Sequence, residues 1–275
     1  MVTMLVEFIT PKLAATYLER NKNNRNIRDR VVEAYAREMK AGNWVVQHQG
    51  IAFNENGDLV DGQHRLHAIV KAGVPIQMTV TRGLPVECVG GIDQGAKRKF
   101  EDVLKMQYAD EAEEALKNTR MVAAIRNVVR YNINHKMNLT FNEIRFMYNA
   151  FREEFDVIHR ITWGGHTGMT GEATGAVASA LIWGEDEEAV VKWCKVFASA
   201  DVKDCEGYNI AAAINWRRQL DDAKLSKRAI NRTNLFLGTE NSIWNFCNDT
   251  EAKVIKIPKA VRYEIKGTLI KAINS

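Results

Sequence analysis

The sequence predicts an α+β protein in which a small α/β part, residues 1–105, precedes a mostly α-helical part, residues 106–275. Strand and turn patterns alternate with helical patterns up to about residue 100, and strand signals nearly vanish beyond it. The chain has 275 residues, of which 46% are hydrophobic. This length and composition allow a sizeable core and one or two domains.

Two helices are predicted at the start of the chain. Thr10-Pro11 has the pattern of an N-cap followed by proline at the first helical position, which predicts a helix over residues 12–21. A second helix is predicted over residues 29–41, because its apolar residues recur at helical spacing. Gly42 is the expected end of this helix.

Strands are predicted in the segment that follows. Residues 44–47 and 50–53 are strand candidates, and the Asn56-Gly57-Asp58 turn predicts a returning strand at residues 59–60. A helix after Arg65 is expected to stop at Gly73. The alternation of residues 75–81 predicts another strand, and a short helix or turn follows at 85–91. Eight helices are then predicted: 101–108, 110–131, 140–155, 171–183, 187–200, 208–223, 226–237 and 241–247.

Composition argues against several classes of protein. No run of about 18 apolar residues occurs, so no membrane span is expected. The first seven residues lack the pattern of a signal peptide. The four cysteines form no CxxC pair, which argues against zinc fingers and a disulfide framework and favours a reducing, cytoplasmic setting. Residues 224–275 carry ten basic and four acidic side chains, which predicts either a phosphate-binding tail or a solvated surface.

The most informative segment is Asp61-Gly62-Gln63-His64-Arg65, between a predicted strand and a predicted helix. Backbone N–H groups at such a turn can face an anion, and the helix dipole adds partial positive charge there. The planar guanidinium of Arg65 fits a phosphate group. The segment therefore predicts a phosphate or nucleotide site.

Each side chain of this segment also has a structural interpretation. Arg65 can contact phosphate or pair with Asp61 or Asp58. Asp61 can cap the following helix, or it can hold a divalent metal such as Mg²⁺ or act as a base. His64 can stack on a base, donate to a phosphate or serve a structural role. His67 shares a helix face with His64, but no third ligand is obvious, so no zinc site is expected.

Other residues are candidate members of the same site. Gln47 can read a base edge or a ribose, and Arg25 can close over a phosphate from the opposite side of a cleft. Lys97 and Arg98 can complete the anion site or touch nucleic acid. For each of these four residues, the alternative is an exposed position on the surface or in a solvated loop.

Four segments in order resemble the phage and prophage ParB-like proteins of the ParB/sulfiredoxin superfamily. They are Asn24-Arg25-Asn26, Met39-Lys40-Ala41-Gly42-Asn43-Trp44, Asp61-Gly62-Gln63-His64-Arg65-Leu66 and Ile92-Asp93-Gln94-Gly95. The resemblance covers residues ~10–105 and extends weakly into the tail. It implies a small α/β fold in which Gly62, Gln63, His64 and Arg65 contact nucleotide phosphates.

The chain departs from individual members of this superfamily. In partition proteins the matching stretch binds CTP, and in sulfiredoxin it binds ATP and carries a reactive cysteine. Gln63 stands at the position of that cysteine, which argues against sulfinic acid reduction because no thiol is available. Gln63-His64 replaces the Glu-Arg of partition proteins, so a CTP preference does not carry over directly.

Three functions are therefore weighed. The first is a phage ParB-like protein of DNA metabolism that binds a nucleoside triphosphate (ATP or CTP, with Mg²⁺), contacts DNA, acts in the host cytoplasm and is a candidate homodimer. The second is a nuclease or phosphotransferase with Asp61 as metal ligand or base and with His64 and Arg65 as catalytic partners. The third is a non-catalytic adaptor whose helical half binds a protein partner.

Overall fold

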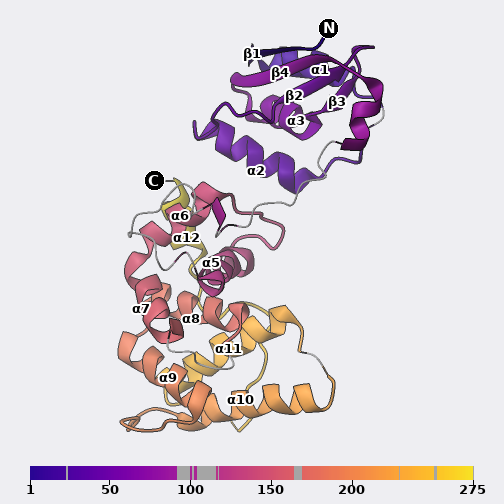
Figure 1. The fold of residues 1–275 in the computed structure, drawn as a ribbon. Helices are drawn as coiled ribbons and strands as arrows, with labels where there is room; N and C mark the ends of the chain where they lie inside the picture. Colours follow the sequence, from indigo (N-terminus) through magenta and orange to yellow (C-terminus); the bar gives the residue numbers. More distant parts are fainter. Residues whose placement is uncertain are drawn as a thin grey trace. The chain divides into compact units, whose positions relative to one another are not determined.

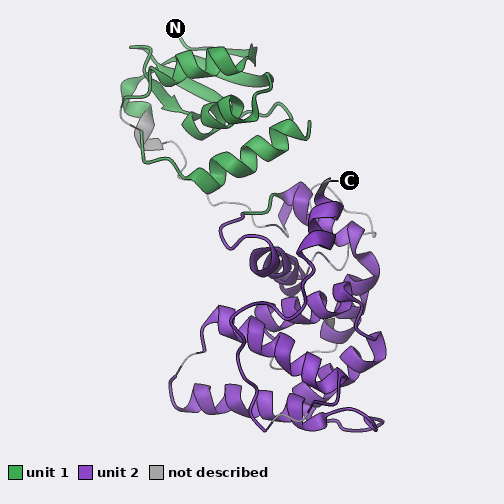
Figure 2. Cartoon of the chain, turned by 180° about the vertical axis from the view of Figure 1, so that it is seen from behind, with its two compact units in different colours: residues 1–97, 138–140 green, residues 98–137, 141–275 purple. Residues whose placement is uncertain are grey.

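The computed structural model describes residues 1–22, 24–91, 100, 102–103, 116, 118–163, 169–228, 230–250 and 253–274. The chain forms two compact units (Figure 2). Unit 1 comprises residues 1–97 and 138–140, and unit 2 comprises residues 98–137 and 141–275. The domain boundary predicted at residue 105 lies outside the described residues.

Unit 1 contains a four-stranded mixed sheet in the order β1-β4-β2-β3 (Figure 1). Its strands are β1 (Thr3–Ile9), β2 (Ile51–Asn54), β3 (Leu59–Asp61) and β4 (Ile76–Leu84). β1 runs antiparallel to β4, β2 runs parallel to β4, and β3 returns antiparallel to β2. This sheet, together with the helices of both units, confirms the predicted α+β class.

Three helices complete unit 1: α1 (Pro11–Leu18), α2 (Asp29–Lys40) and α3 (Gln63–Ala72). Thr10 caps α1, because its side-chain oxygen accepts a hydrogen bond from the backbone N–H of Leu13 at 3.2 Å. α3 packs against both α1 and α2. The core between the helices and the sheet includes Ile9, Val32, Ala36, Met39, Ile51, Phe53, Leu66, Ile69, Met78 and Val80. A 3₁₀ helix, η1 (Val86–Gly91), follows β4.

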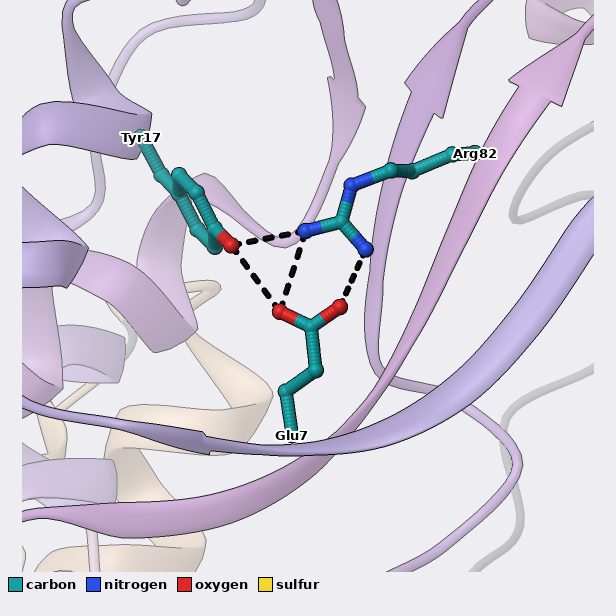
Figure 3. A network of polar contacts seen from close by, with 3 residues as sticks. All are labelled: Glu7, Tyr17 and Arg82. Atoms are coloured by element: carbon teal, nitrogen blue, oxygen red, sulfur yellow. Dashed lines mark hydrogen bonds and ion pairs between the residues drawn. The ribbon is translucent and has the colours of Figure 1, made fainter.

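A polar network joins β1, α1 and β4 (Figure 3). The hydroxyl of Tyr17 donates to a carboxylate oxygen of Glu7 at 2.9 Å, and Arg82 donates to both oxygens of that carboxylate. Hydrogen bonding from Arg82 lowers the pKa of Glu7 below its usual value. The guanidinium also lies over the ring of Phe53, 5.6 Å from its centroid.

Unit 2 consists of helices in its described part: α5 (Thr119–Asn132), α6 (Phe141–Ala150), α7 (Arg152–Trp163), α8 (Gly171–Trp183), α9 (Glu187–Ser199), α10 (Ile210–Leu225), α11 (Arg232–Cys247) and α12 (Lys266–Asn274). α8 is central and packs against α5, α7, α9 and α11 (Figure 1). Small residues of α8 permit this close packing, because a Cβ at Gly175 would lie only 3.3 Å from the carbonyl oxygen of Ala124. No helix in the described chain is long and apolar enough to cross a membrane.

The strands of unit 1 differ from the prediction at two places. Strand β1 was not predicted. The segment 44–47, which was expected to be a strand, is irregular. β2 pairs parallel with β4, and Ile51 lies beside Val80. Extending this pairing backward would place residues 44–47 beside residues 73–76, where β4 has barely begun, so they have no strand to pair with. Instead, the carbonyl oxygen of Gln47 accepts a hydrogen bond from the hydroxyl of Thr79 at 2.7 Å.

Helix boundaries also differ from the prediction. The predicted helix 140–155 is two helices, α6 and α7, which meet at the buried Phe151. The two helices predicted over 226–237 and 241–247 correspond to one helix, α11, which begins only at Arg232. It continues through Gly238, where the ring of Trp216 leaves no room for a side chain. α12 was not predicted. Residues 101 and 104–115 lie outside the described chain, so the helix predicted over 101–108 and the start of the helix predicted over 110–131 stay predictions.

Candidate functional site

The predicted turn between β3 and α3 is present, and the helix begins earlier than expected. Gly62 is the N-cap of α3, so Gln63, His64 and Arg65 form its first turn. The φ of Gly62 is +99°, and a Cβ there would lie 3.0 Å from the Cα of Ile51. Glycine is therefore required both by its backbone conformation and by the approach of β2.

Asp61 does not cap α3 through its side chain. One carboxylate oxygen accepts from the adjacent N–H of Gly62 at 2.6 Å, and the other lies 3.5 Å from Nη1 of Arg65. The same Nη1 donates to the carbonyl oxygen of Gly50 at 3.0 Å. Gly50 itself lies directly on β4, because a Cβ there would be 1.7 Å from the carbonyl oxygen of Thr79. Arg65 thus ties the start of α3 to the segment that leads into β2.

The side chain of Gln63 is buried and links α3 to the loop before α2. Its amide nitrogen donates to the carbonyl oxygen of Arg25 at 2.7 Å, and its amide oxygen accepts from Asn21 at 3.1 Å. Asn24 reinforces this loop by donating to the side chain of Asn21 and to the carbonyl oxygen of Leu59, both at 2.7 Å. The side-chain amide of Gln63 therefore holds this loop in place.

His64 is also buried, and it anchors the start of α2. Its Nε2 accepts from the backbone N–H of Arg28 at 3.0 Å, so this nitrogen carries no proton and the ring is neutral. Burial lowers the pKa of His64, and electrostatic interactions with Arg25, Arg28, His67 and Arg65 lower it further. The protonated form is disfavoured because the surroundings are already cationic.

The structure brings together some of the predicted site residues. Arg25 is exposed in the loop that Gln63 holds, next to the first turn of α3. Gln47 is exposed, and its backbone lies against Thr79 of β4. Lys97 and Arg98 lie outside the described residues, so their predicted roles stay predictions.

Asn21, Asn24 and Arg28 belong to the same site and were not predicted as its members. The sequence carried one signal, the polar run between the first two predicted helices. That run did not indicate which side chains would turn toward α3. As for metals, no group of three or more His, Cys, Asp or Glu residues in the described chain has the geometry to hold an ion.

Unit 2 has a separate open hollow of about 270 Å³ between α7 and α9. Val157, Ile161 and Val191 form its apolar part, and Arg160, Glu187 and Lys195 line it as well. An ion pair of 2.7 Å joins Arg160 to Glu187. Both partners are more than half exposed, so this pair contributes little to stability.

Comparison with known proteins adds no assignment, since no family model, curated protein or solved structure matches this chain. The resemblance to ParB-like proteins therefore stays a prediction.

Proposed function

We propose that the N-terminus of α3 binds the phosphate groups of a nucleoside triphosphate, ATP or CTP with Mg²⁺, in a ParB-like protein of bacteriophage DNA metabolism. One observation carries the proposal. The first turn of α3 is largely buried, yet the described residues provide no acceptor for the backbone N–H groups of Gln63, His64 and Arg65. Such groups need a partner, and phosphate oxygens are suitable acceptors at the positive end of a helix dipole.

The charges around this turn favour an anion. Arg25, Arg28, Arg65 and His67 all lie near enough to His64 to lower its pKa. The adjacent carboxylate, Asp61, is engaged by Arg65 and by the N–H of Gly62. A triphosphate would therefore meet a field dominated by positive charge.

In this proposal, different groups supply different parts of the binding. Backbone N–H groups of the first turn would hold one phosphate, and Arg25 would approach it from the exposed loop. Arg65 has Nη1 engaged with Gly50 and Asp61, and its side chain is 13% exposed. A phosphate would therefore contact Arg65 through Nη2 or Nε, in the geometry that suits a planar guanidinium.

The occupied carboxylate of Asp61 favours a binding role over a catalytic one. A nuclease or phosphotransferase would need this carboxylate for a metal or a proton, and it would first have to leave Arg65. We therefore expect Asp61→Asn to retain nucleotide binding. A loss of Mg²⁺-dependent DNA cleavage or phosphate transfer in this variant, with activity present in the wild type, would favour the enzymatic alternative instead.

Isothermal titration with ATP, CTP, GTP and inorganic triphosphate, each with and without Mg²⁺, tests the proposal. Arg25→Ala should weaken binding about tenfold, the size expected for one hydrogen bond between charged groups. Lys40→Ala is the matched control, since Lys40 is the last residue of the 12-residue α2, ~18 Å from its start. Absence of saturable binding by any of these ligands would overturn the proposal.

We further propose that the tail of unit 2 contributes DNA contacts. All ten basic residues of the segment 224–274 are exposed: Lys224, Lys227, Arg228, Arg232, Lys253, Lys256, Lys259, Arg262, Lys266 and Lys271. Side chains of α10 and α11 hold part of this tail through hydrogen bonds to its backbone. Gln219 makes two hydrogen bonds to Ile255, of 2.8 and 3.2 Å, and Asn241 donates to the carbonyl oxygen of Lys256 at 2.9 Å.

Salt dependence of duplex DNA binding tests this second contribution. Each phosphate contact contributes about 0.9 to the slope of log K against log salt concentration. Replacing Lys256 and Lys259 by Glu should therefore reduce both the affinity and this slope. Lys136→Glu, an exposed lysine of unit 2 outside the tail, is the control. Equal slopes in the tail variant and the control would contradict the assignment.

A further inference from the structure

β1 is the edge strand of the unit 1 sheet, and it exposes an unusual amount of apolar surface. Met4, Leu5, Val6 and Phe8 are 61, 61, 60 and 59% exposed. Because side chains alternate across a strand, Met4, Val6 and Phe8 lie in a row on one face, and Leu5 lies on the other. This row is apolar along its whole length, which marks an interaction surface better than scattered exposed residues would.

The outer edge of β1 has no neighbouring strand in the described sheet. Natural edge strands usually carry lysine, proline or a bulge that prevents pairing with another chain. Residues Thr3–Ile9 contain neither lysine nor proline, and the pairing of β1 with β4 is regular from Thr3 to Ile9. The one charged side chain, Glu7, is engaged by Arg82 and Tyr17 of the same unit (Figure 3). The edge is therefore open to strand addition.

We infer that β1 pairs antiparallel with β1 of a second copy of this chain, across a twofold axis at Val6. In this register Val6 faces Val6 of the second copy, and Met4 faces its Phe8. The two apolar rows then form one cluster on the same face of a sheet that continues through both copies.

The self-complementary pattern of β1 and its charge favour a second copy as the occupant. With the axis at Val6, each Glu7 lies opposite Leu5, so the two carboxylates do not oppose each other. An axis at Glu7 would place them face to face, which is unfavourable. Seven residues per copy is far below the roughly 20–30 residues per side of a standard interface, so we expect a weak, concentration-dependent dimer.

Sedimentation velocity from about 1 to about 200 µM measures this equilibrium. The wild type should shift from monomer toward dimer, and Val6→Lys should raise the dissociation constant at least about tenfold, because two lysines would meet at the axis. Leu225→Lys, on an 82% exposed leucine of unit 2, should behave as the wild type. A wild type that remains monomeric, or a Val6→Lys variant that dimerises equally well, would overturn the inference.

Disulfide trapping tests the register independently of affinity. In a Cys88→Ser background, Val6→Cys should form a disulfide dimer under mild oxidation, because residues opposite each other on antiparallel strands have Cα atoms about 4.5–5.5 Å apart. Leu5→Cys is equally exposed but faces Glu7 in this register, so it should cross-link far more slowly. Equal cross-linking of the two variants would contradict an axis at Val6.

Discussion

Glu240 lies in the middle of α11 with none of its surface exposed. One carboxyl oxygen, Oε2, accepts from the backbone N–H of Arg262 at 2.8 Å. The other, Oε1, is buried with no partner among the described residues. Burial raises the pKa of this carboxyl from 4.5 to about 8, and hydrogen bonding that favours the charged form, chiefly from Arg262, offsets this only in part. Glu240 is therefore largely protonated at neutral pH.

This shift makes the stability of unit 2 depend on pH. Below pH 4.5 the carboxyl is protonated in both the folded and the unfolded state, so it has no effect. Between pH 4.5 and about 8 the folded state keeps a proton that the unfolded state releases, so raising the pH favours unfolding. The slope is about 1.4 kcal/mol per pH unit, which gives a loss of about 2 kcal/mol between about pH 6 and about pH 8.

Urea unfolding followed by tryptophan fluorescence measures this loss, because the buried Trp193 and Trp216 report on unit 2. Glu240→Gln keeps an oxygen that accepts from Arg262 but cannot ionise, so its unfolding free energy should lack this slope. The exposed Glu264, replaced by Gln, is the matched control and should retain it. The reasoning would be refuted if the difference in unfolding free energy between the wild type and Glu240→Gln changed by less than about 0.5 kcal/mol across this pH range.

Three further substitutions test contacts within unit 1 or within unit 2. In urea unfolding, Gly62→Ala should destabilise unit 1 by about 1–3 kcal/mol more than Gly73→Ala. Both glycines have a positive φ, but only a Cβ at position 62 would meet a neighbour, since nothing lies within 4 Å of a Cβ at position 73. Equal losses of stability would refute the close approach of β2 to Gly62. Gly238→Ala should cost at least about 2 kcal/mol, since the added Cβ would lie 2.3 Å from the ring of Trp216, and a neutral result would contradict the packing. Glu7→Gln should cost about 1 kcal/mol at neutral pH, and the wild type should lose this advantage as the pH falls below 4.5 through the lowered pKa of Glu7. A difference that persists in acid would exclude that role for Glu7.

Local patterns predicted the parts of unit 1 whose information is local. The apolar spacing of α2 places Val32, Ala36 and Met39 in the core, and the glycine after Asp61 marks the turn into α3. In both cases neighbouring residues decide the outcome, through helical periodicity or through the backbone freedom of glycine.

The roles of the motif side chains were not predictable in the same way. Gln63, His64 and Arg65 bind backbone atoms of Arg25, Arg28 and Gly50, which lie 38, 36 and 15 residues earlier in the chain. The sequence indicated that these side chains would gather polar partners, and ligand phosphates were the expected ones. Only the fold shows that parts of these side chains are already bound to the protein, and that the backbone N–H groups of the first turn have no acceptor among the described residues.

By itself, the sequence determined the α+β class, the amphipathic helices and the turn at Gly62, since each depends on residues close together in the chain. The tertiary structure decided that residues 3–9 form a strand and that residues 44–47 do not. The first segment finds its partner in β4, about 70 residues away, whereas the second would lie beside residues that precede β4. Strand formation requires a hydrogen-bonding neighbour, and the position of that neighbour is a property of the whole fold.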